Sequence, residues 1–308
     1  MVSIGIPTFS RLAGLRRALE SAQKQDYPNI EIIISDNSST DGTRAYCMSV
    51  RDEDSRVRYM RQDTNVGSER NFASVLEAAR GELFVWLADD DWMDTNYVST
   101  CANHLINNPD FVLAAGHAQY AETEVPGGRS GVNAELTEDR ARDRILSYYR
   151  TVLDNGAFYG VARRAHLLRL PIRRTMGSDW FMMASLAAWG KIAMLAETTL
   201  HRSSGGISKD ADSMIRYYEL SGWAARQPFG MVALNAAREI LWRSPVHRRE
   251  IGLSDRLRLS AKVYATIVGR YADLSPGGSL GHNAWATVHR AGFALLRVAA
   301  PLRRTKKA

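Results

Sequence analysis

Three consecutive aspartates, Asp89, Asp90 and Asp91, directly follow the apolar run Leu83–Ala88. Neighbouring carboxylates raise one another's pKa values, so a cluster of three is unfavourable unless a cation relieves the repulsion. Carboxylate oxygens suit Mg²⁺ or Mn²⁺, whose coordination is completed by water and substrate phosphates. A solvated acidic turn ahead of the next helix is the alternative. Because the run stands at the end of an apolar strand, we favour a site for Mn²⁺ or Mg²⁺.

Two other polar features also follow apolar runs. Pro7 and Thr8 follow the run 2–6, and Asp36 opens a polar cluster directly after the run 30–35. In an open sheet whose strands alternate with helices, ligands bind at the carboxyl ends of the strands. We therefore expect Pro7, Thr8, Asp36 and the three aspartates to line one crevice.

Hydrophobic periodicity indicates the elements that hold these residues. Strands are expected at 2–6, 30–35, 56–60, 83–88, 111–116 and 192–200. Helices are expected after Ser10, at 69–80, at 137–153 and from the turn at Gly177. This alternation is typical of an α/β fold with a mostly parallel sheet flanked by helices. We expect one α/β domain over residues 1–210 and a mainly helical C-terminal extension over residues 211–308.

Six motifs occur in order between Ile6 and Arg202: IPTFSR, SDNSSTDGT, NVG, LADDDW, GSDW and HR. Together they resemble the family 2 glycosyltransferases of the GT-A fold. No single motif is decisive, but their ordered combination is specific. The resemblance implies a Rossmann-like GT-A fold. It also implies an enzyme that moves a sugar from a nucleotide-diphosphate sugar donor to a hydroxyl of a glycan or lipid-linked acceptor.

The resemblance gives binding roles to residues near the first two strands. Pro7, Thr8 and Arg11 would line the nucleotide base and its phosphates. Asp36 would accept a hydrogen bond from the base, and Asp89 would contact the ribose. Residues 1–210 would then form the domain that binds the nucleotide sugar and carries out catalysis.

The aspartate run corresponds to the DxD-type motif of the family, which holds the metal on the diphosphate. Many relatives read Asp-x-Asp-Asp here. In that register Ala88 replaces the first aspartate, and Asp90 and Asp91 hold the metal. A literal DxD reading selects Asp89 and Asp91 instead, and the sequence leaves both readings open.

Asp179, in the motif GSDW, stands where the resemblance implies the general base. A carboxylate there can take the proton of the acceptor hydroxyl while charge builds on the leaving diphosphate, and direct attack would invert the anomeric configuration. Propensity alone favours a simple helix N-cap for Asp179. His201 stands where some GT-A enzymes place a late metal or diphosphate contact. A structural role at the strand end is its alternative.

The positive charge of the chain is concentrated near its end. The net charge is +7, yet the sequence from Leu241 onward holds 13 Lys or Arg and three Asp or Glu. The first 240 residues hold 27 bases and 30 acids, which does not fit a nucleic-acid groove, so we expect no nucleic-acid partner. The basic, amphipathic segment after Trp285 fits contact with an anionic membrane surface, or alternatively an ordinary packing helix or an oligomer contact.

The composition, 45% hydrophobic and 24% charged, is ordinary for a soluble globular protein. Two isolated cysteines, Cys47 and Cys101, favour a reduced setting. The start of the sequence does not resemble a signal peptide, and no apolar stretch is long enough to span a membrane. We expect a cytoplasmic protein, either free or peripheral at the inner face of the membrane.

Two other functions fit parts of the pattern. A sugar-phosphate nucleotidyltransferase has a similar nucleotide-binding layout. However, Thr8-Phe9-Ser10-Arg11 lacks the glycine- and basic-rich loop that such an enzyme would need after its first strand. A non-catalytic glycan-binding relative would not need both the aspartate run and Asp179. We therefore favour the transferase.

Overall fold

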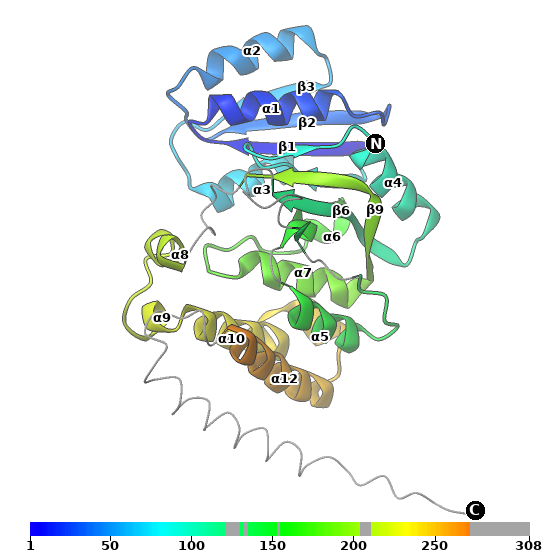
Figure 1. The fold of residues 1–308 in the computed structure, drawn as a ribbon, viewed down its shortest axis with the longest axis vertical. Coiled ribbons are helices and arrows are strands. Elements are labelled where there is room, and N and C mark those ends of the chain that lie inside the picture. The colour runs from blue at the N-terminus through cyan, green and yellow to red at the C-terminus, as the bar shows by residue number, and fades with distance from the viewer. Residues whose placement is uncertain (121–129, 132–134, 153–154, 204–210, 272–308) are drawn as a thin grey trace, which may run out of the picture.

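The computed structural model describes residues 1–120, 130–131, 135–152, 155–203 and 211–271. Within them, one sheet forms the centre of the molecule, in the order β3-β2-β1-β4-β8-β6-β9-β5, with β7 beside β6. Helices lie on both faces of this sheet, and a further group of helices lies beyond α7 (Figure 1). The fold is therefore layered, with the sheet between helices.

The first four strands are parallel. β1 (Val2–Thr8) lies between β2 (Ile30–Asp36) and β4 (Leu83–Trp86), and β3 (Val57–Arg61) pairs with β2 at the edge. Their carboxyl ends consequently meet at one edge of the sheet, which is where the polar features of the sequence follow β1, β2 and β4.

The rest of the sheet is mixed. Its strands are β5 (Trp92–Met93), β6 (Phe111–Tyr120), β7 (Ser130–Gly131), β8 (Val161–Arg163) and β9 (Lys191–Arg202). β8 runs antiparallel to β4 and β6, whereas β6 and β9 are parallel. The short β5 follows the aspartate run and pairs antiparallel with the end of β9, where Trp92 lies opposite His201.

Alternate side chains of the strands enter two hydrophobic cores, one on each face of the sheet. In β4, Leu83 and Val85 belong to one core, and Phe84 and Trp86 belong to the other. The first core is covered by α1 (Leu12–Gln23), α2 (Thr43–Glu53) and α4 (Tyr97–Asn107). The second is covered by α3 (Ser68–Ala78), α5 (Ala141–Thr151) and α7 (Ser178–Trp189).

Helix α7 is buried on every side, since all its residues from Phe181 to Ala188 are buried. A helix that is apolar all round is expected to lie inside a protein. Two short elements, η1 (Gly156–Tyr159) and α6 (Arg164–Leu167), precede α7 in the chain. Asn155, a residue of the site described below, directly precedes η1.

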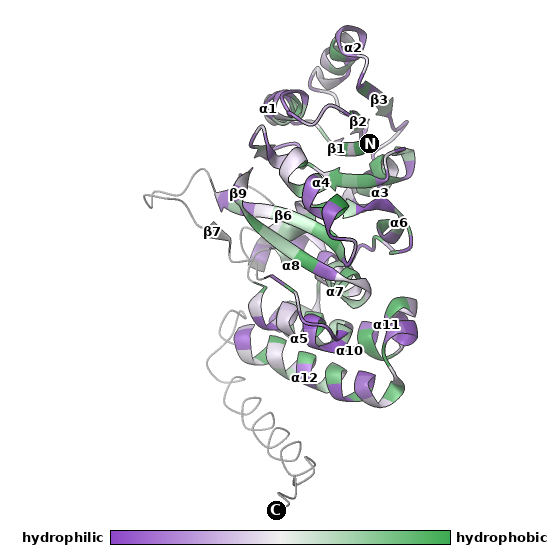
Figure 2. Ribbon diagram, turned by 90° about the vertical axis from the view of Figure 1, so that its right-hand side faces the viewer, coloured by the Kyte–Doolittle hydropathy of each residue, from purple (hydrophilic) through white to green (hydrophobic). Residues whose placement is uncertain are grey.

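The C-terminal helices are α8 (Ala211–Tyr217), α9 (Gly222–Arg226), α10 (Pro228–Arg238), a π-helical turn at Glu239–Arg243, α11 (Pro245–Glu250) and α12 (Leu253–Tyr271). Most of them pack on the far side of α7, whereas α8 lies to one side, where its Tyr217 contacts α3 (Figure 1). Hydrophobic and hydrophilic residues alternate along α12 (Figure 2), whose buried side chains join the same core as α7. The described helical region therefore shares a core with the sheet.

The expected α/β fold is confirmed, with helices on both faces and a helical C-terminal region. The predicted strands correspond to β1, β2, β3, β4, β6 and β9. The sheet is mixed after β4 because the three residues of β8, too few for a periodic signal, insert antiparallel between β4 and β6. The boundary predicted at residue 210 and the basic segment predicted after Trp285 lie outside the described residues. Among the described helices, none is long and apolar enough to cross a membrane.

Candidate active site

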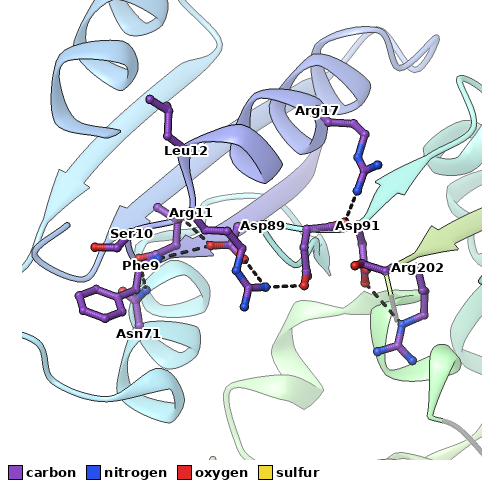
Figure 3. Close-up of polar contacts among 12 residues, drawn as sticks. Phe9, Ser10, Arg11, Leu12, Arg17, Asn71, Asp89, Asp91 and Arg202 are labelled. Atoms are coloured by element: carbon purple, nitrogen blue, oxygen red, sulfur yellow. Dashed lines mark hydrogen bonds and ion pairs between the residues drawn. The ribbon is translucent and has the colours of Figure 1, made fainter. Parts of the chain in front are cut away.

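The aspartate run links the ends of two strands (Figure 3). Asp89 accepts a hydrogen bond of 2.8 Å from the Thr8 hydroxyl at the end of β1. Asp91 accepts one of 3.0 Å from the backbone N–H of Ser203, and Nε of Arg202 at the end of β9 lies 3.4 Å from its other oxygen. The run is therefore fixed on one side to β1 and on the other to β9.

Helix α1, and Arg11 directly before it, pack against the part of the run formed by Asp89 and Asp90. The guanidinium of Arg11 forms an ion pair with Asp90 and lies 3.5 Å from the Asp89 carboxylate. One turn further, a Cβ on Gly14 would lie 2.5 Å from the carbonyl oxygen of Asp89. This helix can approach the run so closely because residue 14 has no side chain.

A column of stacked side chains stands beside the run. The guanidinium of Arg17 lies 3.7 Å from the centre of the Trp92 ring, and this ring stacks on His201 at 5.2 Å and 6°. Nε2 of His201 lies 2.8 Å from Oδ1 of Asp94. Arg17 also donates a 2.8 Å hydrogen bond to the backbone carbonyl of Asp90, so the column helps to position the run.

The described contacts of His201 do not test its expected metal or diphosphate role, which stays a prediction. Its ring is held between Trp92 and Asp94, and no described contact joins it to the aspartate run. Successive side chains of a strand point to opposite faces. For this reason Arg202, the next residue of β9, faces Asp91 instead.

Burial dominates the electrostatics of the run. The side chains of Asp89, Asp90 and Asp91 are 12%, 19% and 3% exposed. Burial raises the pKa of Asp89 and of Asp91 to about 6, and the neighbouring charge of Asp90 adds to the rise in each case. The charges of Arg11 and Arg202 offset part of it. Two of the three carboxylates would therefore be stabilised by an additional cation.

The ends of β1 and β2 are held together by buried polar groups. Asn71, on α3, donates to the backbone carbonyls of Thr8 and Ser35 at 3.3 and 3.0 Å. It also accepts a 2.6 Å hydrogen bond from the Ser35 hydroxyl. The sequence analysis did not single out Asn71, since one asparagine in a helix carries no recognisable signal.

Asp36 lies at the same edge but is fully buried. It accepts hydrogen bonds from the Tyr59 hydroxyl at 2.7 Å, from Arg61 at 2.5 Å and from the backbone N–H of Ser39 at 2.8 Å. Burial alone would raise the pKa of Asp36, but these hydrogen bonds outweigh it and lower the pKa. In this structure the carboxylate is therefore occupied by protein groups.

Asp179 lies in the first turn of α7, while the N-cap position is taken by Gly177 in a left-handed conformation with φ 83°. The N-cap alternative for Asp179 is thus not what the structure shows. Its carboxylate accepts a 2.8 Å hydrogen bond from the amide of Asn155, whose own oxygen accepts one of 2.9 Å from the Tyr148 hydroxyl. Burial raises the pKa of Asp179, and the Asn155 hydrogen bond offsets part of the rise.

The charge of Arg202 acts on the carboxylates of both Asp91 and Asp179. For both carboxylates, burial is the largest effect and raises the pKa. The positive charge of Arg202 offsets part of the rise at Asp91. At Asp179 it offsets less of the rise than the hydrogen bond from Asn155 does. The structure therefore places Pro7, Thr8, Asp36 and the aspartate run at one edge of the sheet, while Asp179 lies in the first turn of α7, where the charge of Arg202 still acts on it. It adds Asn155 and Arg202, which sequence reasoning missed.

The residues of the run fit a divalent cation by their chemistry. In the described part of the chain, no three His, Cys, Asp or Glu side chains are grouped as a ready-made metal cage. Mg²⁺ does not need such a cage, because it is usually held by one or two carboxylates together with water and substrate phosphates. Asp89 and Asp91 can supply such carboxylates, and burial, which raises the pKa of each, makes a nearby cation favourable.

Comparison with known proteins identifies the class to which this fold and site belong. The family described as Glycosyl transferase family 2 matches residues 3–169, which is more than half of the chain. The chain therefore belongs to the family 2 glycosyltransferases. This confirms the resemblance seen in its motifs.

Two curated relatives illustrate the match. Over 100 residues the chain is 35% identical to GalNAc(5)-diNAcBac-PP-undecaprenol beta-1,3-glucosyltransferase of Campylobacter jejuni, covering 32% of either protein. Over 124 residues it is 27% identical to glycosyltransferase GlyG of Streptococcus pneumoniae, covering 40% of this chain and 41% of that protein. The chain thus matches less than half the length of these relatives.

Solved structures show the same fold. Residues 1–349 of S. aureus TarS align with a TM-score of 0.65 and 17% identity, covering 92% of this chain and 76% of that one. The mannosyltransferase PcManGT of Pyrobaculum calidifontis, solved with GDP-Man and Mn²⁺, aligns with a TM-score of 0.54 and 17% identity, covering 96% and 80%. The likeness confirms the expected GT-A fold.

Proposed function

We propose that the chain is an inverting glycosyltransferase that moves a sugar from a nucleotide-diphosphate sugar to a hydroxyl of a glycan or lipid-linked acceptor. The observation that supports this most directly is the aspartate run, which Thr8 holds beside the end of β1 and Arg202 holds beside the end of β9. Asp91, in the run after β4, and Asp179, at the start of α7, both lie within the influence of the Arg202 charge. The aspartate run suits the sugar donor, and Asp179 suits the acceptor.

On the donor side, Pro7, Thr8 and Arg11 would line the nucleotide, and Asp89 would contact the ribose. The hydrogen bond between Thr8 and Asp89 and the half-exposed guanidinium of Arg11 support this placement. Asp36 would reach the base once its bonds to protein groups were exchanged for one to the nucleotide.

Asp90 and Asp91 would hold Mn²⁺ or Mg²⁺. Asp90 has the most exposed side chain of the three, which favours a pair that includes it over Asp89 and Asp91. When bound, the ion would stabilise the negative charge of the leaving diphosphate. His201 would be a third contact to the metal or the diphosphate, with its Nε2 paired with Asp94.

Asp179 would act as the general base. The acceptor oxygen forms a bond to the anomeric carbon while the bond from that carbon to the diphosphate oxygen breaks. The electron pair of the broken bond leaves with the diphosphate, and the proton of the acceptor hydroxyl passes to Asp179. Attack from the side opposite the leaving group inverts the anomeric carbon. A raised pKa makes the ionised Asp179 a stronger proton acceptor.

The acceptor proposal rests on the C-terminal region and on one relative. The name of the C. jejuni relative specifies an undecaprenol-linked substrate. In this chain, Trp242, Leu253 and Leu257 are exposed within residues 222–271, which hold nine Lys or Arg and three Asp or Glu. Exposed apolar and basic side chains together favour contact with an anionic membrane surface, where a lipid-linked acceptor would lie.

Donor hydrolysis provides a test that needs no acceptor, because water can slowly replace it. UDP-, GDP-, CDP- and dTDP-sugars are incubated with the protein and Mn²⁺, and the first anomer released is read by ¹H NMR before mutarotation. An α-linked donor should yield the β sugar first, and Asp179→Asn should abolish the release. Release of the α sugar first would contradict the inverting mechanism.

A further inference from the structure

Helix α8 lies to one side of the helices that pack on α7, and polar contacts hold it there (Figure 1). None of its residues that the structure describes is buried. The hydroxyl of Tyr217, its last residue, contacts the Ser68 hydroxyl and lies 3.3 Å from both carboxylate oxygens of Glu69, in the first turn of α3. From the other side, Arg174 donates a 3.2 Å hydrogen bond to the backbone carbonyl of Tyr217. Helix α8 therefore joins the start of α3 to the loop that precedes α7.

The backbone at the end of α8 fixes the position of the next residue, Tyr218. The N–H of Leu220 donates a 2.9 Å hydrogen bond back to the carbonyl of Ile215. Such a helix end needs a residue in the left-handed conformation, which is usually glycine but here is Glu219, with φ 52°. The Glu219 carboxylate accepts a 3.0 Å hydrogen bond from Arg174. The turn that carries Tyr218 is thus tied to the loop before α7.

The side chain of Tyr218 lies near two carboxylates of different elements. Its ring is perpendicular to that of Tyr217, with centres 4.9 Å apart and planes at 89°. Burial raises the pKa of Tyr218, and the charges of Asp179 and, to a smaller extent, Glu69 add to the rise. Both the proposed base and the first turn of α3 are therefore close enough to act on this hydroxyl.

The start of α3 borders the donor side of the proposed site. Asn37, which follows Asp36 in the chain, accepts a 2.8 Å hydrogen bond from the backbone N–H of Val66. Helix α3 begins at Ser68, two residues later. The end of α8 consequently lies between the donor side and the proposed base. An acceptor must lie in the same region, because its hydroxyl has to reach both the base and the sugar of the donor.

We propose that Tyr218 binds a sugar ring of the acceptor beside the hydroxyl that reacts, with Tyr217 as a positioning residue that holds α8 against α3. The inference rests on the proposed function and adds an acceptor contact to it. Ligand sites are lined mainly by apolar and aromatic side chains, with a few polar groups that fix orientation. The partly exposed ring of Tyr218 offers a flat apolar surface to the C–H groups of a sugar ring, and the nearby Glu69 carboxylate can accept a hydrogen bond from a sugar hydroxyl.

Transfer to simple glycosides tests this contact. Methyl glycosides of glucose, galactose, mannose, GlcNAc and GalNAc are each added to the protein with Mn²⁺ and the nucleotide sugar that it hydrolyses fastest. Diphosphate release should rise above hydrolysis with at least one glycoside. In Tyr218→Ala the KM for that glycoside should rise by about tenfold, while donor hydrolysis stays within about twofold of the unmodified rate. Tyr218→Phe keeps the ring and should retain the KM of the unmodified chain.

Two further variants separate binding from packing. Tyr46→Ala removes a partly buried tyrosine of α2, which contacts Arg16, and should leave the KM for the glycoside unchanged. Tyr217→Phe removes the hydroxyl that contacts α3 and should raise this KM by a smaller factor than Tyr218→Ala, again with donor hydrolysis unchanged. An unchanged KM in Tyr217→Phe would remove Tyr217 from the positioning role. If Tyr218→Ala lowered donor hydrolysis and glycoside transfer by the same factor, Tyr218 would only support the fold, and the inference would be overturned.

The outcomes distinguish this inference from the proposed function. If the unmodified chain releases no diphosphate from any donor, with or without a glycoside, the proposed function is wrong and the role of Tyr218 falls with it. If it hydrolyses a donor but no glycoside raises the release, or if Tyr218→Ala keeps the unmodified KM, Tyr218 does not bind an acceptor sugar, while the donor site stands. Should Tyr218→Ala fail to fold by circular dichroism, Tyr218→Leu gives the same comparison, since it keeps an apolar side chain without the aromatic ring.

Discussion

The amide of Asn155 donates a 2.8 Å hydrogen bond to the carboxylate of Asp179, and the Tyr148 hydroxyl holds Asn155 in turn at 2.9 Å. Burial raises the pKa of Asp179, and this hydrogen bond opposes the rise because it stabilises the ionised form. The protein thus sets both the orientation and the proton affinity of the proposed base through a residue outside the α7 helix.

Replacing Asn155 with alanine should shift the pH dependence of turnover. Without the hydrogen bond the pKa of Asp179 rises further, and a base acts only when it is ionised. The acidic limb of kcat should therefore move to higher pH, so that the rate falls more at about pH 6 than at about pH 8. A pH–rate profile checks this, with Tyr148→Phe expected to give a smaller shift in the same direction. An acidic limb that stays in place or moves to lower pH would contradict the link between Asn155 and the base.

Asp179→Asn should separate binding from chemistry. The amide keeps the shape of the side chain but cannot accept the acceptor proton, so the transfer rate should fall by about 10²–10⁴. Affinity for the nucleoside diphosphate should change little, because Asp179 is not placed on the donor nucleotide. Steady-state kinetics and calorimetry together check the prediction, and retained turnover would remove Asp179 from the base role.

The sequence was most informative where long apolar strands end in polar residues. β1, β2 and β4 were predictable from their runs, and so was the placement of Thr8 and the aspartates at one edge of the sheet, because parallel strands align their carboxyl ends. The order of the six motifs indicated the family 2 glycosyltransferases. Asp179 was located through the motif GSDW, although propensity suggested a cap.

The rest of the site depends on geometry that carries no local signal. Whether His201 or Arg202 faces the aspartates depends on the register of β5 with β9, and β5 has two residues. Asn155 directly precedes a single turn of 3₁₀ helix, which is too short for periodicity. Arg17 is one of two adjacent arginines in α1, and only the packing of that helix shows which one contacts the run.

Gly14→Ala should destabilise the protein. A Cβ at this position would lie 2.5 Å from the backbone carbonyl oxygen of Asp89, and backbone yields less readily than a side chain. Overpacking of this kind costs about 1–3 kcal/mol. Gly269, in α12, is the control because a Cβ there meets nothing within 4 Å, so alanine should stabilise by about 0.5–1 kcal/mol. Denaturant unfolding measures both variants. If Gly14→Ala and Gly269→Ala changed the free energy of unfolding equally, α1 would not approach the run closely.

Arg17→Ala should weaken donor binding more than Arg16→Ala. Arg17 bonds the Asp90 carbonyl and lies over Trp92, whereas the guanidinium of Arg16 lies 4.4 Å from the centre of the Tyr46 ring, away from the run. Each loses a cation–π contact of about 0.5–1 kcal/mol, so both should lose similar stability. The KM for the donor should rise in Arg17→Ala, with Arg16→Ala near the unmodified value. An equal KM in the two variants would rule out positioning of Asp90 by Arg17.

The contribution of Asp89 and Asp91 to stability should fall as the pH rises through the acidic range. The pKa values of Asp89 and Asp91 are about 6 in the folded chain, against about 3.9 when unfolded. The folded state therefore binds these protons more tightly, and their contribution is fully present below about pH 4 and lost by about pH 6. Relative to Asp91→Asn, the unmodified chain should lose stability across this window in urea unfolding. If the difference in unfolding free energy between the unmodified chain and Asp91→Asn stayed constant with pH, the raised pKa of Asp91 would be contradicted.

The central claim is that the aspartate run binds a nucleotide diphosphate together with a divalent cation. A thermal-shift panel of UDP, GDP, CDP and dTDP, each with and without Mn²⁺, tests it most directly. At about 100 times Kd, binding should add about 2.7 kcal/mol of stability. We predict that at least one diphosphate stabilises the chain with Mn²⁺ present, and that combining Asp90→Asn with Asp91→Asn removes the effect. If none of the four stabilises the chain even with Mn²⁺, the claim is wrong.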